Sequence, residues 1–431
     1  MATNSLAGGL SDLGLILTLT EFHKTVGRPE HSCIRATLKA AAVGACMLAV
    51  LSQTSAASSH AITFAAPQSF GAQEYSAFAT ACDLNGDGEL DLVVYGVEGI
   101  SVLLGNGDAT FQPPIHTQLP GVPGLVGVGD FNGDGRLDLA VPMLLALGSG
   151  PPFALACAVV LLGNGDGTFA PPVSYPAGNF CSALAVGDFN NDGNLDLAVA
   201  SIPNLIGTAH KGQVSLLLGN GDGTFRSARS YSVGTNPSYV VASDLNQDGK
   251  LDLVVANDFG GVSILLGDGG GEFSAQTNLV SGGRPASIAV GDFDGDGRPD
   301  LAVANFNTAT VSVFLGRGDG TFRSAVNYPA GLNNCYSVVA SDFNGDGRLD
   351  LAVADYSGGT VQVLDGKQNG TFNPPVVFSL PQNGEWLAVG DFDHDGRPDL
   401  AVSNPSGSVF VMQNTTRGKI RKEKHSAKEQ D

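Results

Sequence analysis

Short apolar segments alternate with turns rich in Gly and Asp along the chain from residue 62 onward. In one typical stretch, residues 287–291 (SIAVG) precede an acidic turn, and residues 301–304 (LAVA) follow it. Residues 311–315 (VSVFL) come next, and a second turn at 316–322 (GRGDGTF) leads to a more polar segment. Alternation over such short segments predicts strands, and a helical period of about 3.6 residues is absent from this region. The pattern therefore predicts four short antiparallel strands in each unit, joined by tight turns.

The acidic turn recurs seven times with one nine-residue pattern: Asp, any residue, Asp or Asn, any residue, Asp, Gly, two further residues, and Asp. The copies begin at Asp83, Asp130, Asp188, Asp244, Asp292, Asp342 and Asp391, at intervals of 47 to 58 residues. A four-stranded unit repeated at about 50 residues is typical of the blades of a β-propeller. We therefore predict an all-β fold, a seven-bladed β-propeller that occupies residues 62–414.

The two ends of the repeat region predict how the ring closes. The last unit runs through residues 409–412 (VFVM) and then lacks a fourth strand. Residues 63–70 (TFAAPQSF), before the first acidic turn, resemble the fourth-strand segment at 168–175 (TFAPPVSY). We therefore expect the N-terminal strand to close the last blade, which removes an exposed sheet edge.

Each acidic turn carries oxygen donors at regular positions. Side chains at positions 1, 3, 5 and 9 converge when the backbone curls, and Gly at position 6, such as Gly347, permits a positive φ. Position 7 is expected to direct its backbone carbonyl inward, which leaves its side chain free to vary. The candidate metal-binding residues are Asp83, Asn85, Asp87, Glu89 and Asp91; Asp130, Asn132, Asp134, Arg136 and Asp138; Asp188, Asn190, Asp192, Asn194 and Asp196; Asp244, Asn246, Asp248, Lys250 and Asp252; Asp292, Asp294, Asp296, Arg298 and Asp300; Asp342, Asn344, Asp346, Arg348 and Asp350; and Asp391, Asp393, Asp395, Arg397 and Asp399.

Flexible coordination by oxygen alone suits Ca²⁺, whereas Mg²⁺ prefers a stricter octahedron and zinc or copper prefers His and Cys. We therefore predict up to seven Ca²⁺ ions, one per blade. The turns at 292–300 and 391–399 have four acids at ligand positions and should bind most tightly, while the turn with Asn246 and Gln247 should bind more weakly. The alternative is that the turns are metal-free Asx-turns that cap hairpins. Repulsion between neighbouring carboxylates, about 1–4 kcal/mol per pair, weighs against that alternative.

The net charge of the chain is −20, and 23 of its 42 acidic residues are the Asp residues of the acidic turns. Seven divalent cations carry fourteen positive charges and would offset most of that net charge. The acidity therefore belongs mainly to the predicted metal sites, and it argues against nucleic acid as a partner.

The string at 342–353 (DFNGDGRLDLAV) and the second turn at 162–169 (LGNGDGTF) resemble the FG-GAP/VCBS repeat family. Members include the propeller of integrin α subunits, many secreted bacterial proteins and some fungal lectins. The resemblance covers residues 62 to about 414. It implies a seven-bladed propeller with Ca²⁺ in the loop between the first and second strands of each blade. It identifies the ligand of the propeller poorly.

Residues 1–61 are expected to be a leader with a signal peptide. Arg35 and Lys39 precede an apolar run at 40–51, and small residues suited to cleavage follow. The protein should therefore be secreted, extracellular or periplasmic, without a transmembrane anchor. The tail, 415–431, is polar and mostly basic and is expected to be disordered. In an oxidising compartment, a Cys157–Cys181 disulfide is plausible, because both residues fall on connections opposite the acidic turns.

No grouping of nucleophile, base and acid recurs on one face of the predicted propeller, so we expect no enzymatic activity. The favoured function is a binding or adhesion module for a protein or glycan, acting as a monomer. The alternatives are an enzyme acting on polysaccharide, either a lyase or a hydrolase, and a purely structural envelope component. Aromatic residues expected on the face opposite the acidic turns either contact that partner or plug the core: Tyr75, Phe180, Tyr239, Tyr336 and Trp386.

Overall fold

The structure is a computed structural model that describes residues 61–72, 78–97, 99–119, 121–146, 156–202, 211–259, 261–332 and 334–417. These residues belong to one compact unit and form strands and turns, with no helix among them. The predicted leader up to residue 60 and most of the predicted tail lie outside the described residues. No helix in the described part is long and apolar enough to cross a membrane.

The described strands are β1 (Gln68–Gly71), β2 (Phe78–Cys82), β3 (Asp91–Gly96), β4 (Gly99–Leu103), β5 (Ile115–Gln118), β6 (Gly121–Pro123), β7 (Gly127–Gly129), β8 (Asp138–Ala146), β9 (Ala156–Leu161), β10 (Val173–Pro176), β11 (Cys181–Gly187), β12 (Asp196–Ser201), β13 (Lys211–Leu217), β14 (Arg229–Ser243), β15 (Asp252–Phe259), β16 (Gly261–Leu265), β17 (Thr277–Leu279), β18 (Pro285–Gly291), β19 (Asp300–Asn305), β20 (Thr310–Phe314), β21 (Val326–Pro329), β22 (Cys335–Ser341), β23 (Asp350–Asp355), β24 (Thr360–Leu364), β25 (Val376–Ser379), β26 (Leu387–Gly390), β27 (Asp399–Asn404) and β28 (Ser408–Met412).

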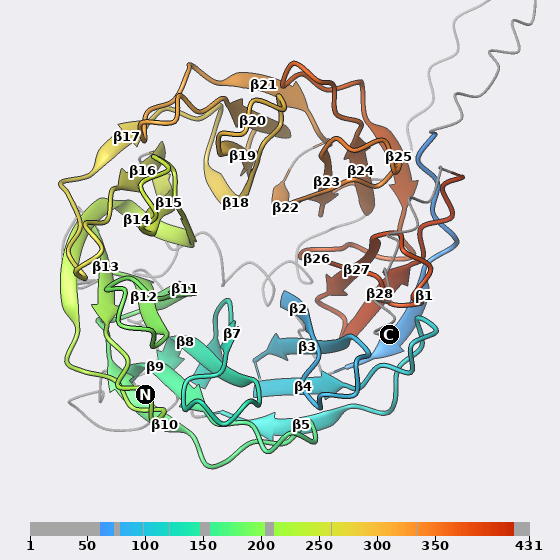
Figure 1. Cartoon of the computed structure of the whole chain (residues 1–431). Helices are drawn as coiled ribbons and strands as arrows, with labels where there is room; N and C mark the ends of the chain where they lie inside the picture. Colours follow the sequence, from blue (N-terminus) through green and yellow to red (C-terminus); the bar gives the residue numbers. More distant parts are fainter. Residues whose placement is uncertain are drawn as a thin grey trace, which may run out of the picture. The chain divides into compact units, whose positions relative to one another are not determined.

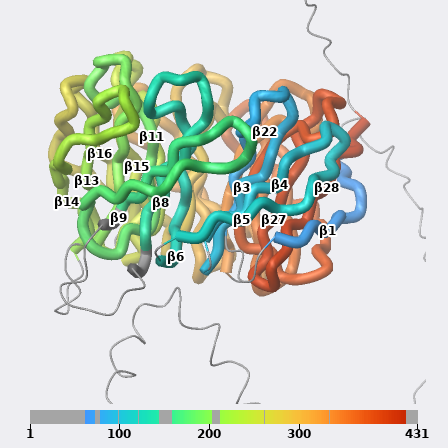
Figure 2. The backbone as a smooth tube through the Cα atoms, turned by 90° about the horizontal axis from the view of Figure 1, so that it is seen from below, coloured from blue at the N-terminus to red at the C-terminus, as the bar shows by residue number. Residues whose placement is uncertain are grey.

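Four antiparallel strands form the repeating unit, as the alternating pattern predicts. The sheets β2-β3-β4-β5, β18-β19-β20-β21 and β22-β23-β24-β25 each follow chain order. Figure 1 shows the sheets arranged around a common centre, with the first strand of each unit innermost and the fourth outermost. Figure 2 shows the same sheets edge-on, standing side by side.

Two regions depart from four separate strands per unit. Strand β14 continues without a break from the outer edge of one unit to the inner edge of the next, so two units merge into one seven-stranded sheet. The register of β14 shifts between Pro237 and Tyr239, where the extended chain turns from one unit to the other. In the second unit, β6 and β7 both pair with β8. The nine-residue turn nevertheless joins the first two strands in all seven units.

The N-terminal strand completes the last sheet, as predicted. Strand β1 pairs antiparallel with β28 in the order β1-β28-β27-β26, with Gln68 opposite Val411. An isolated bridge joins Phe64 to Asn414, and the backbone N–H of Thr415 donates to the carbonyl of Thr63 at 2.8 Å. Bridges of the same kind join Gly105 to Phe111 and Gly163 to Phe169 within other units. Residues near position 64 therefore supply the second turn that the last unit lacks.

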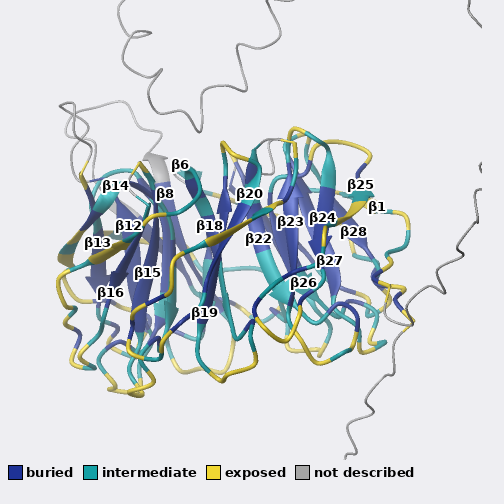
Figure 3. Ribbon diagram, turned by 90° about the horizontal axis from the view of Figure 1, so that it is seen from above, coloured by how far each residue is buried: buried dark blue, intermediate teal, exposed yellow. Residues whose placement is uncertain are grey.

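The hydrophobic core lies between neighbouring sheets. Second strands such as β19 and β23 are buried along their whole length, whereas the turns are exposed (Figure 3). Both faces of these strands are covered, so they read as continuous apolar runs such as LAVA. One core cluster joins Ala79 and Leu92 of the first sheet to Ala388 and Ala401 of the last sheet.

Aromatic side chains near the inner strands plug the core. The Trp386 ring contacts Phe78 with centroids 5.2 Å apart and Tyr239 at 5.7 Å, and all three share a cluster with Leu125. For Tyr239 and Trp386 the core alternative is therefore correct. Phe180 and Tyr336 are half-buried, the Tyr336 ring contacts Phe306, and Tyr75 lies outside the described residues.

Candidate metal centre in the acidic turns

Backbone N–H groups fix the first carboxylate of each acidic turn. Asp292 accepts from Gly295 N through Oδ1 at 2.8 Å and from Gly297 N through Oδ2 at 2.8 Å. Both glycines have positive φ, +74° and +81°. A positive φ was predicted for the Gly at position 6. A second residue with positive φ, at position 4, was not predicted. Gly at position 4 in four of the seven copies was the available signal.

Three copies place a larger residue at position 4 with a positive φ: Asn191 at 55°, Gln247 at 60° and His394 at 56°. Each of these side chains reaches the next unit. Gln247 Nε2 donates to the carbonyl of Gly297 at 2.6 Å, and His394 Nε2 contacts the Glu89 carboxylate. Neighbouring acidic turns therefore touch one another, including those of the last and first units.

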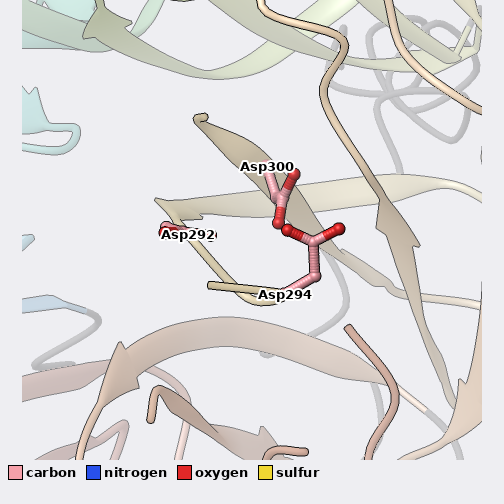
Figure 4. Close-up of side chains that lie close together, drawn as sticks. All are labelled: Asp292, Asp294 and Asp300. Carbon is pink, nitrogen blue, oxygen red and sulfur yellow. The ribbon is translucent and has the colours of Figure 1, made fainter. Parts of the chain in front are cut away.

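The carboxylates at positions 3 and 5 each accept a backbone hydrogen bond of the turn through one oxygen. Asp294 Oδ1 accepts from Asp296 N at 3.2 Å, and Asp296 Oδ1 accepts from Arg298 N at 3.0 Å. Carboxylate oxygens of Asp292, Asp294 and Asp300 lie within 4.8 Å of one another, close enough to hold one ion (Figure 4). Burial, and after it the nearby carboxylates of Asp296 and Asp292, raise the pKa of Asp294.

Asp391, Asp393 and Asp395 form a second acidic cluster within the same 4.8 Å limit. These two clusters belong to the two turns with four acids, which the sequence marked as the tightest sites. The other five turns have Asn at position 3, so an amide oxygen takes the place of one carboxylate there. The assignment of individual ligands in every turn stays a prediction.

The Asp at position 9 is buried and links the acidic turn to the second turn of its own unit. Asp300 is 1% exposed, and its two carboxylate oxygens accept from Phe293 N at 2.8 Å and Gly316 N at 2.7 Å. The same pair of hydrogen bonds occurs at Asp91, Asp138, Asp196, Asp252, Asp350 and Asp399. The spacing of the acidic turn predicts only a metal ligand at position 9 and does not reveal this structural role.

Burial raises the pKa of the carboxylates at position 9, although the backbone hydrogen bonds oppose the shift. The pKa is raised to about 6 for Asp196 and Asp300, to about 7 for Asp399 and to about 8 for Asp350. Neighbouring acids of the same turns add to the rise. Without a cation, these carboxylates are therefore held in a site that disfavours their charge.

In the presence of chelator, we expect the free energy of unfolding to fall as the pH rises from about 4 to about 8. The folded protein holds protons at position 9 that the unfolded chain has already released, because these groups have a raised pKa only when folded. Stability is therefore present below the unfolded pKa and is lost as the pH passes the folded pKa values. Thermal unfolding in chelator across this range measures the trend, and stability that rises with pH contradicts it.

Position 7 does more than offer a carbonyl. In five turns it carries Lys or Arg, and each cation pairs with the carboxylate at position 5 of the same turn. The Arg298–Asp296 distance is 3.3 Å, and the Arg348–Asp346 and Arg397–Asp395 pairs are shorter. Exposed pairs of this kind contribute little stability. The prediction that the side chain at position 7 makes no contact was therefore incomplete. Each of these Lys or Arg side chains occupies the carboxylate at position 5, which is also a candidate metal ligand.

Backbone hydrogen bonds also join three of the acidic turns to the second turn of the following unit. Gly223 N donates to the carbonyl of Phe131 at 2.9 Å, and Gly271 N donates to that of Phe189 at 3.1 Å. Ala109 N in the first unit donates to the carbonyl of Phe392 in the last unit at 2.7 Å. These hydrogen bonds hold the three turns against the neighbouring unit.

Cys181 is disulfide-bonded, whereas Cys82 and Cys335 are free. Cys335 begins β22 just as Cys181 begins β11, so the two cysteines hold equivalent places in different units. The side chain of Cys157 lies outside the described part of the structure. The Cys157–Cys181 pairing therefore stays a prediction.

The donor set of the acidic turns fits Ca²⁺ chemically. Each turn presents carboxylate and amide oxygens on a flexible loop, the type of ligand that Ca²⁺ prefers. The hydrogen bonds expected of metal-free Asx-turns are also present, so backbone geometry does not separate the two interpretations. Those bonds leave the repulsion among Asp292, Asp294 and Asp300 without a counter-ion, which a cation would provide.

A family model described as "FG-GAP-like repeat" matches residues 83–141, 150–199, 202–255, 244–303, 292–353 and 342–402. The chain therefore belongs to the FG-GAP-like repeat family. All seven copies of the acidic turn fall within these matches, which confirms the resemblance inferred from the sequence.

Curated relatives include phosphatidylinositol-glycan-specific phospholipase D from Mus musculus, 32% identical over 153 residues, and from Homo sapiens, 33% identical over 153 residues. The match covers 30% of this chain but only 17% of the mouse protein and 18% of the human protein.

Among solved structures, BBS1N in complex with ARL6DN has a TM-score of 0.54 at 16% identity and covers 81% of this chain and 96% of that chain. A structure of an Agrocybe aegerita lectin that recognises non-reducing terminal N-acetylglucosamine has a TM-score of 0.49 at 21% identity, with coverage of 78% and 87%. At these identities the first likeness concerns the fold alone.

Proposed function

We propose that this protein is a secreted, Ca²⁺-loaded, seven-bladed β-propeller that closes through its N-terminal strand and binds a protein or glycan partner without chemical turnover. The observation that carries the proposal is the seven-fold recurrence of one acidic turn, with its first carboxylate, its left-handed residues and its buried Asp in equivalent places. Pairing of β1 with β28 and the core shared by the first and last sheets support the closed ring.

The disulfide at Cys181 supports an oxidising compartment, which agrees with a secreted or periplasmic protein. Secretion itself is inferred from the predicted signal peptide within residues 1–61. The structurally similar BBS1N is described in complex with ARL6DN, which is consistent with a binding role for this fold. The monomeric state and the identity of the partner are part of the proposal.

A Ser–His contact in the first unit has a structural explanation, which supports a binding role over catalysis. Ser101 Oγ lies 2.8 Å from His116 Nδ1. Buried serines at the same place in other units bond to the neighbouring strand: Ser215 to Ser230 at 3.1 Å and Ser312 to Asn327 at 2.7 Å. His116 is therefore the cross-strand partner that this position of the repeat ordinarily has.

Removal of Ca²⁺ should destabilise the protein strongly. Each occupied site contributes about 2.7 kcal/mol when free Ca²⁺ is a hundredfold above the dissociation constant, so several sites act together. Calorimetric titration of chelator-treated protein should show uptake of up to seven ions, and the melting temperature should fall in chelator. Asp292→Ala should lower Ca²⁺-dependent stability more than Asn246→Ala, because Asn246 belongs to the turn that is expected to bind Ca²⁺ most weakly. Absence of cation uptake, or an unchanged melting temperature, contradicts the metal assignment.

The binding role is tested with labelled protein on arrays of glycans and extracellular proteins, with Ca²⁺ and with chelator. We expect a retained partner in Ca²⁺ that is lost in chelator. Failure to retain any partner, or release of cleaved products from polysaccharide, argues against a binding module without chemistry.

A further inference from the structure

A group of aromatic and charged residues lies at the ends of the strands that point away from the acidic turns. Strands β15, β19 and β23 each begin with the Asp at position 9, so their other ends lie on the opposite face. At or just beyond those ends are Phe259, Phe306 and Tyr356. Arg284, Tyr336 and Glu385 stand at or near the start of the neighbouring first strands. These six residues are called the ring patch.

The positive charge in the ring patch is already neutralised. Arg284 Nε donates to Asp258 Oδ1 at 2.6 Å, and Nη2 donates to Oδ2 at 2.5 Å, a bidentate pair. The guanidinium also lies over the rings of Phe259 at 4.8 Å and Phe306 at 5.4 Å. The ring patch thus contains one cation held between aromatic faces, and this Arg has little capacity left to attract an anion.

The remaining rings pack against one another and are half-buried. The Tyr336 ring packs against Phe306 at 4.9 Å and against Tyr356 at 5.7 Å, both nearly edge to face. Phe259 is 51% exposed, and Val280 and Leu332, in the loops that precede β18 and β22, are 86% and 72% exposed. Exposed apolar side chains of this size on one face of a protein are typical of a binding surface.

Glu385 is the charged residue of the ring patch whose carboxylate has no partner among the described residues. Its backbone N–H donates to the carbonyl of Ser403 at 2.9 Å, but within the described residues no hydrogen bond or ion pair reaches its carboxylate. The starts of β26 and β22 lie side by side, because the backbone N–H of Leu387 donates to Ser337 Oγ at 3.2 Å, and this places Glu385 next to Tyr336. Burial raises the pKa of Glu385 to about 7. A partly buried carboxylate without a donor is unfavourable until it acquires a cation.

We propose that the ring patch binds an organic ammonium group, with the Glu385 carboxylate as its counter-ion and the faces of Tyr336 and Tyr356 as its aromatic wall. This inference rests on the proposed binding function and names its ligand class. Charge complementarity favours it: an anion would meet Glu385 and an already paired Arg284, and a neutral sugar would leave the Glu385 charge uncompensated. Ammonium groups are attracted by aromatic faces within about 6 Å and by carboxylates. The group can come from a free quaternary amine or from a lysine side chain of a protein.

Trp386 offers a direct readout, because it is the single tryptophan of the chain and follows Glu385. Ca²⁺-saturated full-length protein is titrated with choline, with a capped lysine peptide, and with the uncharged analogue of choline in which carbon replaces nitrogen. Fluorescence and calorimetry record each titration. We expect choline or the lysine peptide to bind saturably and the uncharged analogue to bind at least about tenfold more weakly.

Glu385→Gln keeps the shape of the side chain and should weaken binding of the ammonium probe by about tenfold or more. Glu272→Gln is the matched control, because Glu272 lies in a second turn on the other face and should leave binding unchanged. The melting temperature of both variants and their Ca²⁺ uptake establish that they are folded. Equal binding of the uncharged analogue, full affinity in Glu385→Gln, or no binding of either ammonium probe overturns the inference. Ca²⁺ uptake and partner retention by the wild-type protein test the proposed function separately, so the two failures are distinguishable.

Discussion

Replacing Asp300 by Ala should lower the free energy of unfolding by about 3–5 kcal/mol, the largest effect expected of a single substitution in this protein. The Asp300 carboxylate is 1% exposed and accepts from the backbone N–H groups of Phe293 and Gly316. Truncation leaves both donors buried without an acceptor and cuts the link between the two turns of the unit. Chemical denaturation in chelator measures the loss without any contribution from a bound cation.

Asp300→Asn is the control, since its amide oxygen can still accept one of the two hydrogen bonds. We expect a smaller loss of stability in chelator but a similar loss of Ca²⁺ affinity, because the charge is gone in both variants. Asp296→Ala should show the reverse balance: a small effect in chelator and a clear effect on Ca²⁺ binding. If Asp300→Ala and Asp296→Ala are equally stable in chelator, the structural role assigned to position 9 is wrong.

Deletion of residues 61–72 should lower the free energy of unfolding by about 5 kcal/mol through lost apolar burial. Ile62 is 5% exposed, and the Phe64 ring packs on Phe343 and Phe378 with centroids 5.9 and 5.1 Å away. The deletion also leaves the N–H and C=O groups along β28 without their partner strand β1. Such an exposed edge pairs readily with other chains, so we expect aggregation as well.

The comparison is with a chain that starts at residue 61, which keeps the strand. Adding residues 61–72 back as a separate peptide should restore part of the lost stability, because the edge of β28 with which β1 pairs remains in the truncated protein. Denaturation and light scattering follow both effects. A truncated protein as stable and as monodisperse as the control contradicts the role assigned to β1.

Much of the fold was predictable from the sequence because each unit repeats the same local signals. Short apolar segments such as SIAVG and LAVA, each bounded by turns, predicted the inner strands, and the likeness of residues 63–70 to 168–175 predicted the partner of β28. The continuous β14 was not predictable, because the sequence around Gly234 and Pro237 contains residues typical of turns. Pairing on both sides holds that segment extended, and local propensity does not contain this information.

In the acidic turns, the donors at positions 1, 3 and 5 followed from residue type and spacing. The double role of Asp300 did not, because burial depends on the second turn of the unit folding back onto it. The ion pairs of position 7 had a signal in the repeated Lys and Arg. The sequence contains almost no signal for the ring patch. Arg284, Tyr336 and Glu385 belong to three different units and come together only when the units assemble.

The pairing of β1 with β28 also sets an order of events for the growing chain. Hydrogen bonds between Thr63 and Thr415 join residues separated by 352 positions, whereas the other sheets close over a few dozen residues. During synthesis or export, the early strand has to wait, unpaired, until the final strand emerges. Contacts between residues so distant along the chain form slowly. We therefore expect completion of the last sheet to be a late step of folding, and we expect the chain to be most vulnerable to proteases and to self-association before that step.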